Sequence, residues 1–416
     1  MRRVPADGIN LFQSIYGLLR GYSEKTGLPP LNLSLGNPDG VPPEPIRALK
    51  AKFAADPRLD YHAYAEDRDL HGFAEAMVEL HGGIRVREHG GLRALPIPGI
   101  KTASALIPLA CGLHLPGARR RERFVLAVNA PAYDVAGVWA AQYLAGRRLV
   151  WPLESASDMR LKAGRLERAL REEGLERADL VFVIRPGNPA SVGAGAAEWR
   201  ALIAHCLRRG TRLVNDAAYA GLAGPGHVPL AAVAKDFPGL EWLELYSVSK
   251  SFSDPGARLG ALVGSADFVA DFATIKGNAE SGPVPSVMAA YGQFLGERAA
   301  ARSVLEGLRS LYRARLDYLI PRLKAAGLRP ACPTEAGFFT LWRVPRRVLG
   351  VDLAKDLRCA GLPAAEAFNR LVAAETGLGG VHFPGLIRYA VCADVLSADF
   401  QGRFEKGLRK LRPEYD

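Results

Sequence analysis

The most informative stretch of this chain is Ser247-Val248-Ser249-Lys250-Ser251-Phe252-Ser253-Asp254-Pro255-Gly256-Ala257-Arg258-Leu259-Gly260. It follows an apolar run that is typical of a buried strand. A lysine just beyond a strand, among hydroxyls and glycines, favours a covalent site for an aldehyde cofactor, because a partly desolvated amine readily forms an imine. Ser247, Ser249 and Arg258 suit a phosphate dianion. A loop lysine with serine caps remains the structural alternative.

Similar apolar runs recur through the middle of the chain, each bounded by Gly, Pro, Asn or Asp. They lie at 124–128, 180–184, 211–215, 243–247 and 259–263. Helical stretches separate them, such as 197–209 with Trp199, Leu202 and Cys206 at 3–4 residue spacing. This alternation predicts an α/β fold with a doubly wound, mostly parallel sheet, in which ligands bind at the carboxyl ends of the strands.

The pattern changes after residue 280. We expect a long helix from about Pro285 to Ile320, stopped or kinked by Pro321. A strand at 338–342, a helix near 364–376, a strand at 386–391 and a terminal helix follow. These elements predict a large domain over 46–280 and a smaller α+β domain made of 1–45 and 281–416.

Composition excludes several classes of protein. The chain has 416 residues, 54 Lys and Arg against 43 Asp and Glu, and a net charge of +11. The basic residues are scattered, and even the run Arg119–Arg123 contains Glu122, so a solvated surface is favoured over nucleic-acid or membrane binding. No apolar run reaches transmembrane or signal-peptide length. Five cysteines without a CxxC pair argue against a metal cage or disulfides and favour a cytoplasmic location.

Polar side chains also follow two other predicted strands. Asp216 closes the run 211–215, where a carboxylate is costly to bury unless it meets a cation such as a protonated pyridine nitrogen. Tyr219 could direct its hydroxyl at the phenolic oxygen of such a ring, and Asn188 could donate its amide hydrogen to that oxygen. An Asn-Pro pair taken alone is more often a plain turn.

Taken together, these residues resemble the class I and II aminotransferase family of pyridoxal-phosphate (PLP) enzymes, of fold type I. The family's residues match Asn188, Asp216, Tyr219, Lys250 and Arg258 in order, with 28 residues from Asn188 to Asp216, 34 from Asp216 to Lys250 and 8 from Lys250 to Arg258. The resemblance implies PLP held on Lys250 as an internal aldimine, a Schiff base. It implies transfer of an amino group between an α-amino acid and a 2-oxo acid, with Lys250, Asp216 and Tyr219 as catalytic residues.

The resemblance extends over nearly the whole chain and implies further site residues. They are Gly36, which crosses over the substrate; Tyr64, which reaches the cofactor phosphate of a partner subunit; the phosphate-binding amides of Gly99, Ile100 and Lys101, before a helix expected from Ala103 to Cys111; Tyr133, which stacks on the pyridine ring; and Arg388, which grips the substrate α-carboxylate. The role of Tyr64 implies a homodimer with shared active sites. As alternatives, Tyr64 is an ordinary buried aromatic, Tyr133 is structural and Arg388 is a surface arginine.

Departures from the family pattern leave the reaction open. Only two residues separate Gly385 from Arg388, where many relatives have a loop of about ten, so one wall of the substrate pocket is expected to be short. The Gly99-Ile100-Lys101 segment resembles the branch of LL-diaminopimelate aminotransferases. The alternative function is a PLP enzyme of the same fold that performs β- or γ-replacement, carbon–carbon bond formation or oxidation on an amino acid. No metal is expected.

Overall fold

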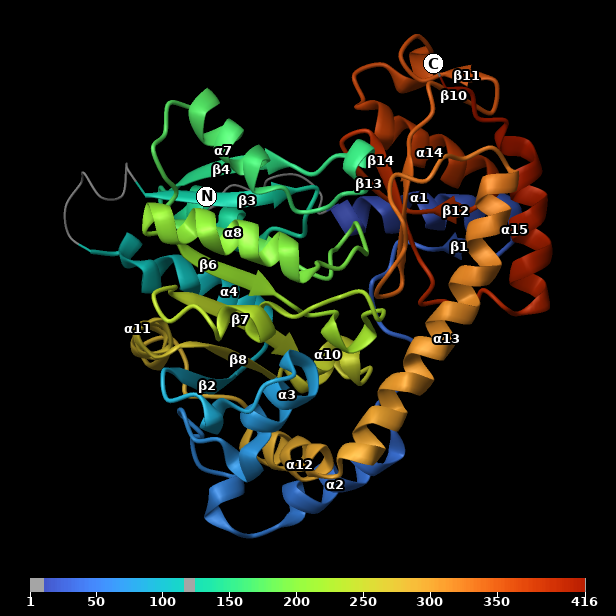
Figure 1. Cartoon of the computed structure of the whole chain (residues 1–416). Helices are drawn as coiled ribbons and strands as arrows, with labels where there is room; N and C mark the ends of the chain where they lie inside the picture. Colours follow the sequence, from blue (N-terminus) through green and yellow to red (C-terminus); the bar gives the residue numbers. More distant parts are fainter. Residues whose placement is uncertain (1–10, 116–123, 416) are drawn as a thin grey trace, which may run out of the picture.

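The computed structural model describes residues 11–115 and 124–415. The basic run at 119–123 and the first ten residues lie outside the described residues. Figure 1 shows a sheet with helices on both sides, a second and smaller group of elements beside it, and the long helix α13 running between the two. No helix in the described ranges is long and apolar enough to cross a membrane.

The large sheet has seven strands among the described residues, with the spatial order β2-β8-β7-β6-β5-β3-β4. Strands β3 to β7 pair in parallel, whereas β8 is antiparallel to both of its neighbours. The strands are β2 (Leu92–Ile97), β3 (Val125–Ala130), β4 (Arg147–Pro152), β5 (Leu180–Ile184), β6 (Arg212–Asp216), β7 (Trp242–Ser247) and β8 (Gly260–Ser265). The link from β7 to β8 contains no long crossover helix, so β8 returns beside β7 in the opposite direction.

Alternating residues of the central strands enter two different hydrophobic cores, because successive side chains point to opposite faces of a sheet. Val181 and Val183 of β5 join one core, and Leu180, Phe182 and Ile184 join the other. Helices α3 (Phe73–Gly82), α7 (Ala163–Glu172), α8 (Ala196–Arg209) and α9 (Leu230–Ala234) cover the first face, and α4 (Ile100–Pro108), α6 (Val135–Tyr143) and α11 (Ala266–Gly277) cover the second. The doubly wound, mostly parallel α/β sheet predicted from sequence is confirmed.

The smaller group of elements packs around a third core that includes Phe338, Trp342 and Tyr389. Its strands form the sheet β13-β14-β9 and the pairs β1-β12 and β10-β11. The elements are α1 (Leu11–Thr26), β1 (Leu31–Asn32), β9 (Phe339–Arg343), β10 (Arg347–Val348), β11 (Val351–Asp352), α14 (Ala364–Thr376), β12 (Leu378–Gly379), β13 (Val381–Phe383), β14 (Leu386–Ala390) and α15 (Ala398–Leu411). The turn from β13 to β14 is a tight hairpin in which Phe383 pairs with Leu386.

The prediction of one long helix from Pro285 to Ile320 is wrong in two respects. The structure has α12 (Pro285–Gly296) and α13 (Arg298–Ala325), separated at Glu297, and α13 continues through Pro321. Pro321 is exposed, whereas Leu319 and Leu323 on either side of it are buried in the third core. Tertiary packing therefore outweighs the lost helical hydrogen bond. Helix α12 packs against α3 and against α2 (Glu44–Ala55), on the side of the large sheet.

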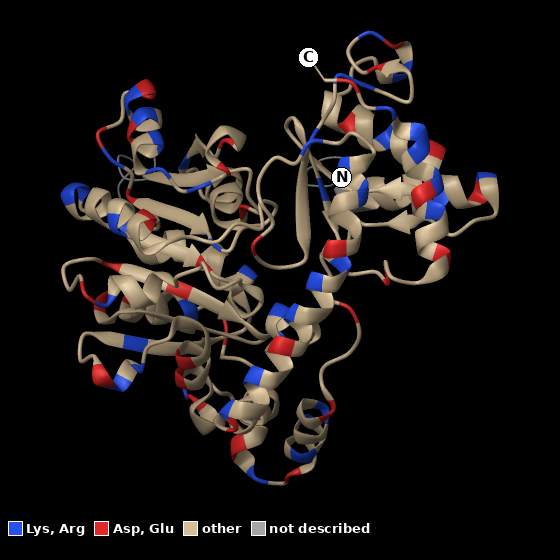
Figure 2. Ribbon diagram, turned by 45° about the vertical axis from the view of Figure 1, so that its right-hand side comes forward, with Lys and Arg blue, Asp and Glu red and all other residues tan. Residues whose placement is uncertain are grey.

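Short elements connect these units. They are η1 (Leu59–Tyr61), η2 (Leu70–Gly72), η3 (Val86–Glu88), η4 (Leu109–Leu113), η5 (Ser155–Ser157), η6 (Ala220–Leu222), α10 (Val248–Ser251), η7 (Pro255–Ala257) and η8 (Leu357–Cys359). Charged residues of both signs lie along α13 (Figure 2), and the basic ones outnumber its two acidic residues, Glu306 and Asp317. Arg313 forms an i,i+4 ion pair with Asp317. All five cysteines are unpaired.

Candidate active site

Three neighbouring strands bring the predicted site residues to one edge of the large sheet. Ile184 of β5 pairs with Asp216 of β6, which in turn pairs with Leu245 of β7. Since these strands are parallel, their carboxyl ends meet at the same edge. Asn188 follows β5, Asp216 ends β6 and Lys250 follows β7. The order of residues along the chain thus becomes a cluster in space.

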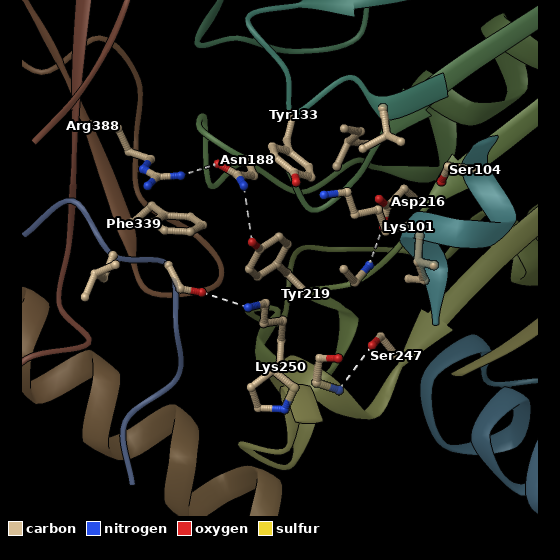
Figure 3. A pocket seen from close by; sticks show the side chains of 18 of the residues that line it. Lys101, Ser104, Tyr133, Asn188, Asp216, Tyr219, Ser247, Lys250, Phe339 and Arg388 are labelled. Carbon is tan, nitrogen blue, oxygen red and sulfur yellow. Dashed lines mark hydrogen bonds between the residues drawn. The ribbon is translucent and has the colours of Figure 1, made fainter. Parts of the chain in front are cut away.

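A cavity of about 700 Å³ lies at this edge, between the large sheet and the smaller group of elements. It is lined by most of the site residues predicted from sequence: Gly36, Ile100, Lys101, Tyr133, Asn188, Asp216, Tyr219, Ser247, Ser249, Lys250, Arg258 and Arg388. Figure 3 shows Lys250, Asp216, Tyr219 and Asn188 directed into this space from the strand ends. Tyr64 is 77% exposed and does not line the cavity. Its role toward a partner subunit stays a prediction.

Lys250 lies in the single turn of α10, directly after β7. The Ser247 hydroxyl caps this turn by accepting a hydrogen bond from the Ser249 amide at 3.1 Å. Lys250 Nζ donates to the Gly36 carbonyl at 2.7 Å. Burial lowers the pKa of Lys250 to about 8, and the positive charges of Arg388 and Arg258 act in the same direction. About a tenth of this amine is therefore neutral at pH 7, far more than in an unperturbed lysine.

Asp216 is a buried carboxylate that meets no cation within the described part of the chain. Its one hydrogen bond there is from the Ala218 amide, at 2.9 Å. Burial raises the pKa of Asp216 to about 6. A buried carboxylate without a positive partner is costly, and a protonated pyridine nitrogen supplies that partner. The chemistry of this position fits PLP.

The residues expected to hold phosphate also converge. Gly99 caps the start of α4 with a φ of +92°, and a Cβ built at Gly99 would lie 2.7 Å from Nη2 of Arg258. Only glycine admits this close approach of the guanidinium to the start of the helix. Ser247 and Ser249 line the same cavity. Free amides at a helix start, a guanidinium and two hydroxyls form a suitable cradle for a phosphate dianion.

A second network reaches the cavity from β14. Arg388 is only 3% exposed, and it donates to Asn188 Oδ1 at 2.8 Å and to the Ser34 carbonyl at 2.7 Å. Asn188 Nδ2 in turn donates to the Tyr219 hydroxyl at 3.3 Å. Arg388 has neutral acceptors, and its Nε has no partner. A buried guanidinium with only neutral acceptors is suited to an incoming carboxylate. The alternative that Arg388 is a surface arginine is wrong. Strand β14 lies between β13 and β9, and all five of its residues are buried.

Sequence reasoning missed eight of the residues that line the cavity, among them Ser104, Phe339 and Tyr16. Ser104 stands one turn after Lys101 in α4, so the i,i+3 spacing could have identified it. That helix begins at Ile100 and ends at Pro108, not at Ala103 and Cys111 as expected. The centre of the Phe339 ring lies 4.1 Å from the Arg388 guanidinium carbon. The same ring packs so closely on Gly36 that a Cβ built at Gly36 would lie 3.0 Å from it. Tyr16 reaches the cavity from α1, and no local pattern marks it.

Comparison with known proteins supports the same interpretation. A family model described as aminotransferase class I and II matches residues 30–377. The LL-diaminopimelate aminotransferase of Syntrophobacter fumaroxidans is 29% identical over 85% of this chain and 87% of that protein. The corresponding protein of Dehalococcoides mccartyi is 25% identical over 79% of this chain and 80% of that protein.

Solved structures share the fold at low sequence identity. N-succinyldiaminopimelate aminotransferase from Mycobacterium tuberculosis superposes with a TM-score of 0.75 at 20% identity, over 98% of this chain and 99% of that chain. Aspartate aminotransferase from Thermus thermophilus with maleate has a TM-score of 0.73 at 20% identity, over 99% of each chain. These likenesses define the fold as that of PLP enzymes of fold type I.

The chain belongs to the aminotransferase class I and II family, since the family model matches most of its length. Within that family it is similar to the LL-diaminopimelate aminotransferases compared above. It is therefore a PLP-dependent transferase, as the sequence analysis expected.

Proposed function

We propose that this chain transfers an amino group between an α-amino acid and a 2-oxo acid in the cavity around Lys250. The observation that carries the proposal is that a half-buried lysine, Lys250, and a buried carboxylate without a cation among the described residues, Asp216, line the same cavity. When bound, PLP supplies an aldehyde that condenses with amines and a ring that draws electrons from the substrate Cα. Asp216 would hold the ring nitrogen in its protonated form.

The remaining cofactor contacts are assigned by chemistry. Arg258, Ser247, Ser249 and the amides of Gly99, Ile100 and Lys101 would bind the phosphate. Tyr219 and Asn188, already joined by a hydrogen bond, would face the phenolic oxygen. Tyr133, which lines the cavity and is 46% exposed, would cover one face of the ring.

Arg388 would bind the α-carboxylate of the amino acid. Two parallel hydrogen bonds from its guanidinium to the carboxylate would fix the orientation of the substrate Cα–H bond. The single ammonium group of a lysine could not do this. The carboxylate would replace neutral acceptors of Arg388, at Asn188 and Ser34, with a charged one. Gly36 and Phe339 would close the substrate side of the cavity.

Lys250 would act as the base and acid for proton transfer. In its neutral form its Nζ would accept the proton from the substrate Cα and would return it to the carbon that was the cofactor's aldehyde. A pKa of about 8 suits this task, because an efficient proton-transfer group titrates near the working pH. The Gly36 carbonyl, which accepts a hydrogen bond from this amine, would help to direct it.

We further propose a cytoplasmic homodimer with a large domain over 46–280 and a small domain over 1–45 and 281–416. The exposure of Tyr64 supports the dimer, because a side chain that reaches a partner's phosphate must project from its own subunit. The short β13–β14 hairpin beside Arg388 supports a pocket open to long amino acids. The names of the relatives place LL-diaminopimelate among the amino donors to be tried first.

A half-reaction tests this proposal. The holoprotein is mixed with single amino acids, LL-diaminopimelate included, without any 2-oxo acid. Transfer predicts one equivalent of 2-oxo acid and loss of the absorbance of the lysine-bound cofactor. Release of ammonia, or of a substituted amino acid, with the absorbance regenerated would contradict it.

A further inference from the structure

The segment between Lys250 and Arg258 is attached to the rest of the protein at its midpoint, Asp254. This residue stands four positions after Lys250 and four before Arg258 and is 6% exposed. Its Oδ2 accepts two hydrogen bonds at 2.9 Å, one from Lys50 Nζ and one from the Tyr291 hydroxyl. A carboxylate held by an ammonium and a hydroxyl is a strong, directional anchor.

The two donors come from helices that pack against each other. Lys50 lies on α2, and Tyr291, which is fully buried, lies on α12. Neither helix lines the cavity around Lys250. Asp254 therefore connects the segment 250–258, called the cofactor segment below, to a pair of packed helices that do not line the cavity.

Arg258 depends on this attachment. It is exposed, and the hydrogen bond recorded for its guanidinium goes to the Pro255 carbonyl of its own segment, at 3.3 Å. Its backbone has a φ of +47°, and Ser253 has a φ of +52°, both in the left-handed region that non-glycine residues avoid. Such conformations persist only where neighbouring contacts hold them. The Ala257 amide donates to the Asp254 carbonyl at 3.2 Å, which links the anchor to the turn η7 before Arg258.

We propose that Asp254 is a positioning residue that sets the place of Arg258 and so makes the site prefer the phosphorylated cofactor over pyridoxal. The inference rests on the proposed role of Arg258 toward phosphate. Loss of the anchor frees the segment to leave the left-handed conformations, and the guanidinium then moves away from the start of α4. The turn that carries Lys250 is capped independently by the Ser247 hydroxyl, so binding of the rest of the ring is retained.

Two ligands that differ only in the phosphate test this role. Dissociation constants for PLP and for pyridoxal are measured with the apoprotein of the wild type and of Asp254→Asn, which has nearly the same shape. The expected result is weaker PLP binding by about tenfold or more, the worth of about one charge-assisted hydrogen bond, with pyridoxal binding changed less than about twofold. Lys50→Met should shift the ratio of the two constants in the same direction, and it serves if Asp254→Asn does not fold.

Two further variants separate the possible failures. Arg258→Ala sets the full scale of the phosphate preference, and an unchanged ratio in this variant would overturn both the role of Arg258 and the present inference. Glu79→Gln removes the charge from a carboxylate on α3 that is shared by Arg85 and Arg298, away from the cofactor segment. It should leave the ratio unchanged. If Arg258→Ala lowers the preference while Asp254→Asn weakens both ligands equally or neither, Asp254 does not position Arg258.

Discussion

Replacement of Asp216 by Asn should make the apoprotein more stable at neutral pH. The Asp216 carboxyl has a pKa of about 6 in the folded chain, against 3.8 for the unperturbed group, because burial disfavours its charge. This difference corresponds to about 3 kcal/mol of destabilisation once the group is ionised in both states. Asn keeps an oxygen that accepts from the Ala218 amide and carries no charge to bury.

The sign of the pH dependence follows from proton binding. Between about pH 4 and 6 the folded state holds the Asp216 proton more tightly than the unfolded state, so stability falls as the pH rises. The full penalty is present above about pH 6, and about half of it remains at pH 5. The stability gained by Asp216→Asn should therefore be largest at pH 7.5 and smaller at pH 5.

Urea denaturation of the two apoproteins at both pH values measures this difference. The cofactor is first removed from the wild type with a hydroxylamine wash and gel filtration. In the PLP-bound proteins the order should reverse, because Asn cannot pair with a protonated ring nitrogen. A variant apoprotein that is no more stable than the wild type at pH 7.5 would refute the reasoning, since Asp216 would then already have a stabilising partner.

Three further predictions concern single residues. The rate at which the apoprotein captures PLP on Lys250 should rise with pH and level off above about pH 8, because burial lowers the pKa of Lys250 to about 8. Stopped-flow absorbance measures this rate, and a rate that keeps rising to pH 10 would contradict the prediction. Arg388→Lys should lower kcat/KM for the amino donor by about a hundredfold, through loss of the two-point grip, and leave the dissociation constant of PLP unchanged; equal losses in both would instead indicate a disturbed cavity. Pro321→Ala should raise the free energy of unfolding by about 1–3 kcal/mol, because this exposed proline removes a hydrogen bond from the interior of α13. A less stable variant in urea denaturation would show that the helix needs the proline.

The central strands of the large sheet could be predicted because both of their faces are buried. Strand β5 reads as an unbroken apolar run, and its predicted and observed bounds agree. The two strands of the large sheet that were missed, β2 and β4, are its edge strands. Strand β4 alternates exposed and buried residues and begins with Arg147 and Arg148, and β2 contains Arg93 and Pro96. Such runs resemble loops until a neighbouring strand pairs with them.

In the candidate site, too, the residues that follow buried strands could be predicted, whereas those that arrive through tertiary packing could not. Asn188 and Lys250 follow buried strands and Asp216 ends one, so parallel strand order alone brings them together. Phe339 and Tyr16 reach the cavity only because the smaller group of elements folds back over the sheet, a tertiary event that no local pattern encodes. The anchor at Asp254 joins residues more than 200 positions apart in sequence, and its lysine partner looks in sequence like any surface residue.

The covalent link to Lys250 can be tested directly by borohydride reduction of the holoprotein, followed by proteolysis and mass spectrometry. The account predicts one pyridoxyl phosphate adduct for each chain, on the peptide that contains Lys250. An adduct on Lys101, the other lysine that lines the cavity, or no adduct in a protein incubated with PLP, would contradict it.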